Sequence, residues 1–246
     1  MGEQSLISLE PLVRIENLSR SYALGSSRIQ ALRSLNLTVP SGVFAAVKGR
    51  SGSGKTTLLN MIGGLDKPTE GKVYVFGKDL SSLSNREITD LRRRQVGFVF
   101  QSFAIIPILS AVENVELMLR IGGMWRGRRE RAMRCLEIVG LADWANHRPW
   151  ELSGGQQKRV AIARALAAKP LLILADEPTA ELDSTSGRQI LALFRYIVEK
   201  EKVTIITATH DPMVEEYAHI IYELGDGQVQ STRIIDPSLR HQSESV

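Results

Sequence analysis

The sequence predicts an α/β fold whose buried parallel strands present functional residues at their carboxyl ends. Two short apolar runs, residues 43–47 and 171–175, are typical of strands that are buried on both faces. A glycine-rich loop follows the first run, an acidic pair follows the second, and a helical pattern comes after each. Ligands of open α/β sheets bind outside the carboxyl ends of the strands, so we expect these loops to meet at one site.

Length and composition fit one α/β domain or two small ones. The chain has 246 residues, of which 43% are apolar and 24% charged, as in soluble proteins with a sizeable core. A net charge of +4 is too small to indicate nucleic-acid binding by itself. Cys135 is the only cysteine, which excludes an internal disulfide and favours a reducing compartment. The sequence shows no signal peptide and no apolar run that could span a bilayer, so any membrane role is expected to come through a partner.

The elements before the glycine-rich loop are predicted to be strands that follow a loose arm. Residues 12–18 partly alternate between apolar and polar side chains, which indicates a strand. Tyr22 comes next and is expected at the edge of a loop rich in Gly and Ser. Residues 31–39 form a second predicted strand, and a turn at residues 40–42 leads into the buried strand 43–47.

The glycine-rich loop matches the P-loop pattern G-x-x-x-x-G-K-[ST] between a strand and a helix. It consists of Gly49, Arg50, Ser51, Gly52, Ser53, Gly54, Lys55 and Thr56, and Thr57 continues into the helix. The glycines allow backbone amides to cradle phosphate oxygens, while Lys55 reaches the β- and γ-phosphates and Thr56 ligates Mg²⁺. Coincidence is the alternative, but it produces this pattern in only about one chain in a hundred of this length.

The middle of the chain alternates strands and a polar helix. Residues 72–76 and 96–100 are predicted strands, and residues 84–94 form a helix that ends in three arginines. This basic end is expected to be solvated, with contact to a polyanion as the alternative. Gln101 lies at the carboxyl end of its strand, where functional residues gather, although a loop hydrogen bond would also explain it.

Residues from about 102 to 160 are predicted to form a helical insertion. The apolar segment 103–109 is broken by a proline, and it is either core or an exposed patch that receives a partner helix. Residues 110–119 and 128–139 follow with helical periodicity. The charge cluster at residues 125–134 is expected to be a solvated face, with lipid headgroup contact as the alternative.

The segment Leu152, Ser153, Gly154, Gly155 and Gln156 has the form of a helix start. Ser153 can act as the N-cap and Gln156, three residues on, can complete a capping box. The two glycines leave first-turn amides open, and open amides at a helix N-terminus bind anions. An ordinary capped helix is the alternative.

An acidic pair ends the buried strand 171–175. Asp176 at the strand end can hold Mg²⁺, and Glu177 can act as general base on a water molecule. Two solvated turn acids would be the alternative, but the phosphate loop favours the chemical roles. Asp183 follows closely, and a helix at residues 185–200 leads to the next strand.

The last part of the domain places a histidine at another strand end. The predicted strand 203–208 is followed by His210, then by a short helix at residues 212–217 and a strand at 220–224. A turn at residues 225–227 closes the domain, and the polar tail begins near residue 236.

Together, in this order, the motifs resemble the ATPase subunit of an ATP-binding cassette (ABC) transporter. The resemblance implies a P-loop NTPase (RecA-like) core with an antiparallel β subdomain and a helical insertion at about residues 102–160. It covers a single domain, residues 12–230, flanked by an arm at 1–11 and a tail at 236–246.

The resemblance also implies a role for each motif. Gln101 is the Q-loop residue, which would contact Mg²⁺ or the attacking water. His210 is the switch histidine that would hold the γ-phosphate, and Asp183 belongs to the D-loop. Tyr22 stands where the family has an aromatic that stacks on adenine, with a packed core aromatic as the alternative. Residues 152–156 are the signature segment, which would bind ATP held by the P-loop of a second copy.

Finer features resemble the macrolide-export, lipoprotein-releasing and cell-division branch of this family. They are residues 101–103, 106–109, 113–115, Glu151 and 176–183. Members of that branch work with permeases that have few membrane helices and a large extracytoplasmic domain. Macrolide exporters fuse ATPase and permease, so the lack of a membrane part here favours a separate subunit. Arg50 departs from the branch pattern, but this position contributes its backbone and little loss is expected.

The function implied is ATP hydrolysis, with Mg²⁺, by a homodimer that drives an integral membrane permease from the cytoplasmic face. Efflux or lipoprotein or peptide extrusion is the expected role, and regulation of cell-wall hydrolysis through a division-type permease is the alternative. A soluble cassette ATPase acting on DNA or ribosomes is a further class. Its members carry long coiled coils or two cassettes, which this sequence lacks, and no direct nucleic-acid partner is expected. The resemblance implies that the permease, and not this chain, selects the cargo.

Overall fold

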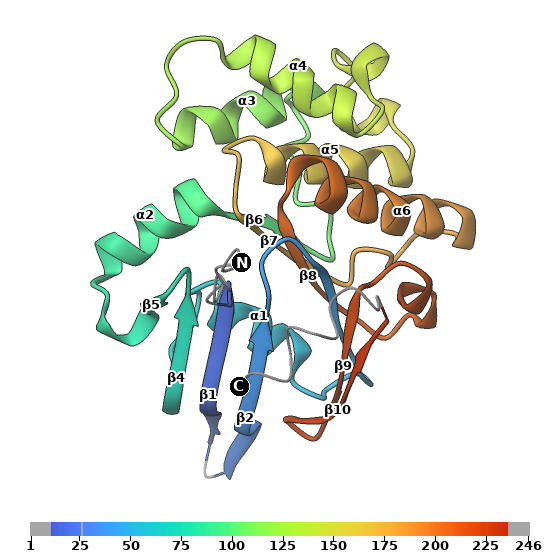
Figure 1. Ribbon diagram of the computed structural model, residues 1–246. Helices are drawn as coiled ribbons and strands as arrows, with labels where there is room; N and C mark the ends of the chain where they lie inside the picture. The colour runs from blue at the N-terminus through green and yellow to red at the C-terminus, as the bar shows by residue number, and fades with distance from the viewer. Residues whose placement is uncertain (1–10, 26, 236–246) are drawn as a thin grey trace, which may run out of the picture.

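The computed structural model describes residues 11–25 and 27–235 (Figure 1). The expected tail, and the arm apart from residue 11, lie outside the described residues. The strands are β1 (Val13–Leu24), β2 (Ser27–Val39), β3 (Phe44–Lys48), β4 (Glu70–Val75), β5 (Lys78–Asp79), β6 (Val96–Val99), β7 (Leu172–Asp176), β8 (Thr204–Thr209), β9 (Ile220–Gly225) and β10 (Gln228–Ile234). The helices are α1 (Lys55–Ile62), α2 (Asn85–Gln95), α3 (Ala111–Ile121), α4 (Arg128–Ile138), α5 (Gly154–Leu166) and α6 (Ser184–Glu201), with 3-10 helices η1 (Leu80–Ser82), η2 (Ala142–Trp144), η3 (Pro149–Glu151) and η4 (Pro212–Glu216).

A mixed sheet of the order β10-β9-β3-β8-β7-β6 forms the centre of the described part of the chain. Its strands from β9 to β6 are parallel, and β10 joins the edge antiparallel to β9. Successive β3 residues face opposite sides, so Phe44 and Ala46 pack with the cluster around α5 and α6, whereas Ala45 and Val47 pack with the cluster around α1. Because both faces of the sheet are covered, the sequences of β3 and β7 are continuous apolar runs.

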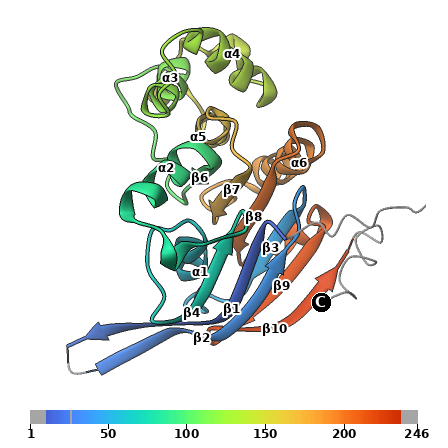
Figure 2. The same ribbon diagram turned by 60° about the vertical axis from the view of Figure 1, so that its left-hand side comes forward.

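A second, antiparallel sheet of the order β2-β1-β4-β5 covers the opposite side of α1. Apolar side chains of β1, β2 and β4 share one core cluster with α1 and one face of the central sheet. Helix α1 is therefore held between the two sheets (Figure 2). This packing fixes the start of α1 next to the carboxyl end of β3, which is what a phosphate loop requires.

Helices α3, α4 and α5 form a helical lobe above the central sheet (Figure 1). Their apolar faces join α6 and the other face of the sheet in a single core cluster. Reciprocal capping boxes begin α2 at Ser84, α3 at Ser110 and α5 at Ser153. The predicted helix starts at these serines, including the one in the signature segment, are thus confirmed. Within the described residues, no helix combines the length and the apolar character that crossing a bilayer requires.

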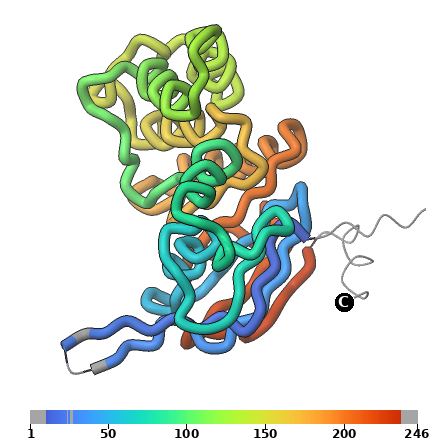
Figure 3. The backbone as a smooth tube through the Cα atoms, turned by 90° about the vertical axis from the view of Figure 1, so that its left-hand side faces the viewer, coloured from blue at the N-terminus to red at the C-terminus, as the bar shows by residue number. Residues whose placement is uncertain are grey.

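The structure refines the expectations from the sequence at three places. Tyr22 lies inside β1, paired with Ile29 of β2, rather than at the edge of a loop, because the hairpin extends well beyond the body of the molecule (Figure 3). The short helix predicted at residues 212–217 is present as the 3-10 helix η4, whose start is capped by Asp211. The chain continues after the turn at residues 225–227 into β10, which the sequence reading did not predict.

Candidate nucleotide site

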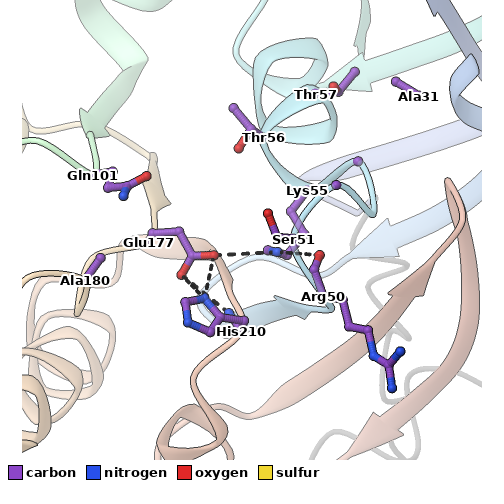
Figure 4. A pocket seen from close by; sticks show the side chains of 12 residues that line it. Ala31, Arg50, Ser51, Lys55, Thr56, Thr57, Gln101, Glu177, Ala180 and His210 are labelled. Atoms are coloured by element: carbon purple, nitrogen blue, oxygen red, sulfur yellow. Dashed lines mark hydrogen bonds and ion pairs between the residues drawn. The ribbon is translucent and has the colours of Figure 1, made fainter. Parts of the chain in front are cut away.

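A cavity of about 690 Å³ lies at the carboxyl edge of the central sheet (Figure 4). Its walls come from the loops that follow β3, β6, β7 and β8, together with the first residues of α1 and one residue of β2. The lining residues are Ala31, Arg50, Ser51, Gly52, Gly54, Lys55, Thr56, Thr57, Gln101, Glu177, Ala180 and His210. The sequence-predicted P-loop, Q-loop, acidic pair and switch histidine therefore meet at one place, as expected for the carboxyl ends of parallel strands.

The P-loop presents the start of α1 to this cavity. Gly54 precedes the helix with φ of 103°, a left-handed conformation that glycine adopts without strain. No side chain caps α1, so its first-turn N–H groups remain available to an anion. Gly49 is required for a different reason, since a Cβ there would lie 2.2 Å from the carbonyl oxygen of Leu224. The buried Oγ of Ser53 also lacks a hydrogen-bond partner.

Lys55 is almost fully buried and its ammonium is held by the loop itself. Nζ donates to the carbonyl oxygens of Gly49 at 2.8 Å and Arg50 at 3.1 Å. The same atom lies 3.5 Å from Oε1 of Glu177. A positive charge is thus fixed between the loop that would hold phosphates and the carboxylate that would act on water.

Glu177 occupies a strained backbone position immediately after β7. Its φ is 43°, and its N–H donates to the carbonyl oxygen of Ala208 at 2.8 Å. Both carboxylate oxygens lie 3.1 Å from Nδ1 of His210, which comes from the end of β8. Unfavourable backbone conformations persist where the surrounding structure imposes them, and they gather at functional sites. The carboxylate is oriented from two sides, by Lys55 and by His210.

Asp176 and Thr56 fit a Mg²⁺ ion. Burial raises the pKa of Asp176, while the hydroxyl of Thr56 acts in the opposite direction. The buried Oδ1 of Asp176 has no hydrogen-bond partner, as expected for an atom that coordinates a cation. Mg²⁺ in phosphate sites takes one or two protein oxygens and completes its shell with phosphates and water, which matches this pair. No cluster of three His, Cys, Asp or Glu side chains occurs among the described residues, and such a site does not need one.

Gln101 lies two residues beyond the end of β6, and it lines the cavity on the same side as Glu177, opposite the P-loop (Figure 4). Because β6 is the edge strand of the sheet, the loop that follows it has no further strand to pair with. The loop therefore depends on other contacts for its position.

The signature segment lies outside the lining of the cavity, at the start of α5. Leu152 is buried, Ser153 accepts a hydrogen bond from the N–H of Gln156, and Gly154 and Gly155 open the helix. Nearby, the carboxylate of Asp183 caps α6 by accepting from the N–H and Oγ of Ser186, which lowers the pKa of Asp183.

Tyr22 is not among the residues that line the cavity. Its hydroxyl donates to Asp66 at 2.8 Å, and the guanidinium of Arg20 lies 4.5 Å from the ring centroid. The ring is partly exposed, which differs from a packed core aromatic. Stacking on adenine stays a prediction.

A second hollow, of about 490 Å³, lies beside the Q-loop. Its apolar lining includes Phe98, Phe100, Met118 and Ile121, and its basic lining consists of Arg92, Arg93 and Arg164. We call this hollow the groove. Of the predicted apolar patch at residues 103–109, Ile105 packs against the core while Ile108 is 75% exposed, and the reception of a partner helix there stays a prediction.

Sequence reasoning missed Lys158, which is fully buried on α5 and binds the Q-loop backbone. A signal did exist. Lys158 lies one helical turn before Ile162 on the face of α5 that packs into the core, where a lysine is unexpected.

Comparisons with known proteins agree with this geometry. The model of the family described as ABC transporter matches residues 32–180. An uncharacterized ABC transporter ATP-binding protein of Methanocaldococcus jannaschii, MJ0796, is 46% identical over 224 residues, which is 89% of this chain and 95% of that protein. The macrolide export ATP-binding/permease protein MacB of Syntrophobacter fumaroxidans is 44% identical over 222 residues, covering 89% of this chain but 31% of its own.

Solved structures agree as well. A dimeric structure of the MJ0796 cassette in a post-hydrolysis state, bound to ADP and Pi, superposes with a TM-score of 0.82 at 45% identity, covering 91% of this chain and 99% of that one. The predicted α/β fold is thereby confirmed. The chain therefore belongs to the ABC transporter family, and it is one of the ATP-hydrolysing domains of that family, which use ATP with Mg²⁺.

Proposed function

We propose that this chain forms an ATP-bridged homodimer that drives a separate membrane permease from the cytoplasmic face of the membrane. The observation that carries the proposal is the division of the phosphate-binding parts. The P-loop cavity contains Lys55, Glu177 and His210, whereas the signature helix start lies outside it. In a dimer, the P-loop cavity of one copy would be completed by the signature segment of the other copy.

In a head-to-tail dimer, each P-loop cavity would receive the signature segment of the other copy. Ser153 and the first-turn amides of α5 would contact the γ-phosphate that is held by the P-loop of the other copy. The relative MJ0796 supports this arrangement, because its cassette has been solved as a dimer, once with ADP and Pi. Loss of the γ-phosphate would remove the bridge and open the dimer, which is a nucleotide-driven two-state switch.

The cavity geometry supports hydrolysis by in-line attack of water. Thr56 and Asp176 would hold Mg²⁺, which neutralises developing phosphate charge. Glu177 would accept a proton from the attacking water as the bond between the γ-phosphorus and the β–γ bridging oxygen breaks. Lys55 would stabilise charge on the phosphates, and His210 would orient Glu177 and hold the γ-phosphate.

The groove is the proposed docking site of the permease. It is continuous with the Q-loop, because Phe100 and Ala104 line it on either side of Gln101. Its apolar and basic lining suits a short helix that carries both apolar and acidic side chains. A helix seated there would move the loop of Gln101 and so report the state of the permease to the ATP site.

The resemblance to the macrolide-export branch, supported by the MacB relative, favours efflux or lipoprotein or peptide extrusion. A division-type role is the alternative within the same branch. The identity of the permease distinguishes these two roles. The experiment is therefore to identify the permease that binds this chain.

The test is a pull-down with tagged Glu177→Gln protein, ATP and Mg²⁺ from detergent-solubilised native membranes, read by mass spectrometry. Recovery of a permease with few membrane helices and a large outer domain supports the proposal and points to the cargo. A matched bait that also carries Phe100→Glu in the groove should lose the permease while retaining ATP binding. Recovery of ribosomal or DNA-associated proteins without a permease would overturn the membrane role.

A further inference from the structure

Lys158 is a buried cation that the proposed reaction does not use. It lies in the second turn of α5 with no exposed surface, and burial lowers the pKa of its ammonium to about 8, against an opposing effect of Glu181. Burying a lysine is unfavourable unless its donors are fully used, so its contacts explain what it does there.

All of its described polar contacts go to the backbone of the Q-loop. Nζ donates to the carbonyl oxygen of Gln101 at 2.7 Å and to that of Phe100 at 3.2 Å. The ring of Phe103 lies 5.1 Å from Nζ, which adds a cation–π contact from the same loop. Three of four consecutive loop residues are thus held by one side chain, beyond the end of the edge strand β6.

A second residue of α5 extends this attachment. The guanidinium of Arg164 donates to the carbonyl oxygen of Ala104, and burial lowers the pKa of Arg164 as well. At the other end, Phe103 lies against the start of α5, since a Cβ on Gly154 would be 3.5 Å from its ring. The loop carrying Gln101 is therefore joined to the helix that begins with the signature segment.

We propose that Lys158 is a positioning residue for Gln101, fixing the backbone that presents the Gln101 side chain to Glu177 and joining the Q-loop to the signature helix. The inference rests on the proposed role of Gln101 in hydrolysis. The two hydrogen bonds to the loop carbonyls do not depend on the charge of the amine, because a neutral amine retains donors for both, whereas the contact with Phe103 requires the ammonium.

The test compares variants of the full-length purified protein. Lys158→Met keeps an unbranched apolar side chain, one heavy atom shorter than lysine, and removes the donors, whereas Lys158→Gln retains an amide donor one bond closer to the backbone. Lys200→Met applies the same change to an exposed lysine of α6. Gln101→Ala serves as the reference for losing the side chain that Lys158 positions.

We expect Lys158→Met to lower kcat at least about tenfold, because small misplacements of catalytic groups are costly. Its ATP affinity should stay within about twofold of wild type, since the P-loop is untouched. Hydrogen exchange should accelerate in the peptide spanning residues 100–104 and remain unchanged in α1. Lys158→Gln should recover part of the lost kcat, and Lys200→Met should match wild type.

Wild-type turnover and exchange in Lys158→Met would overturn the proposal. So would a lower melting temperature with unchanged turnover per folded molecule, because that is a purely structural role. If Lys158→Met does not fold, the same two measurements on Lys158→Gln test the proposal. A lower kcat of Lys158→Gln with unchanged hydrogen exchange at residues 100–104 would contradict a positioning role. Normal turnover in Gln101→Ala would instead refute the proposed role of Gln101, which separates the two failures.

Discussion

Glu177→Gln removes the charge of the proposed general base and retains its shape. In the structure, the carboxylate lies 3.5 Å from the ammonium of Lys55 and 3.1 Å from Nδ1 of His210. The amide preserves a polar contact to His210 but can neither accept the proton of water nor pair with Lys55. Two effects of opposite sign follow, since turnover should fall and ATP binding should strengthen.

General-base catalysis sets the size of the first effect, and the distance between Lys55 and Glu177 sets the size of the second. Loss of a general base costs about 10²- to 10⁴-fold in turnover. The Coulomb energy of the Lys55–Glu177 pair at 3.5 Å is about 1 kcal/mol at the dielectric constant of water and about 5 kcal/mol at an effective value of 20. Lys55 must leave this carboxylate to reach a phosphate, so removing the charge should tighten ATP binding at least about fivefold.

The assay combines steady-state phosphate release with titration of a fluorescent ATP analogue on the same preparations. Glu199→Gln is the matched control, because Glu199 lies exposed on α6, far from the cavity lining, and its carboxylate forms an ion pair with Arg195. We expect turnover reduced at least 100-fold, tighter nucleotide binding and an ATP-stabilised dimer in gel filtration. Turnover within threefold of wild type would refute the general-base assignment, and unchanged or weaker ATP binding would refute the argument from Lys55.

Lys55→Ala should weaken ATP binding by more than about tenfold, and normal affinity in the same titration would argue against its phosphate contact. Ser153→Arg should leave ATP binding by the monomer intact and abolish turnover; unchanged phosphate release would contradict a site in trans. Arg233 and Lys48 lower the pKa of Glu215 to about 2, so this ion-pair cluster stabilises the fold above about pH 4.5 and stops doing so as the pH falls toward 2. Glu215→Gln should therefore be less stable by about 1 kcal/mol at pH 7, with a difference that vanishes near pH 2 in urea titrations, whereas a constant difference would exclude this cause.

Patterns that depend on local chemistry were read correctly from the sequence. The buried runs of β3 and β7 are apolar because both faces of a parallel sheet are covered, and Ser153 signals a helix start because its side chain replaces a missing backbone partner. The P-loop could be placed because its glycines are demanded by backbone geometry, as at Gly54.

Features that depend on tertiary context were not readable. Strand β10 pairs only with β9 at the sheet edge and is mostly exposed, so it has no apolar periodicity to detect. Tyr22 was placed at a loop edge because nothing local to the sequence reveals that the β1–β2 hairpin continues past the body of the molecule. Lys158 was overlooked because a lysine is ordinarily solvated, and its partners are carbonyls distant in the sequence.

The central claim, that each ATP site combines the P-loop of one copy with the signature segment of another, is tested most directly by mixing two inactive variants. A mixed dimer of Lys55→Ala and Ser153→Arg contains one doubly damaged site and one intact site. Random pairing makes half of the dimers mixed, so the mixture should recover about a quarter of wild-type phosphate release while each variant alone releases almost none. Phosphate release that stays at the level of the separate variants would contradict a site shared between two copies.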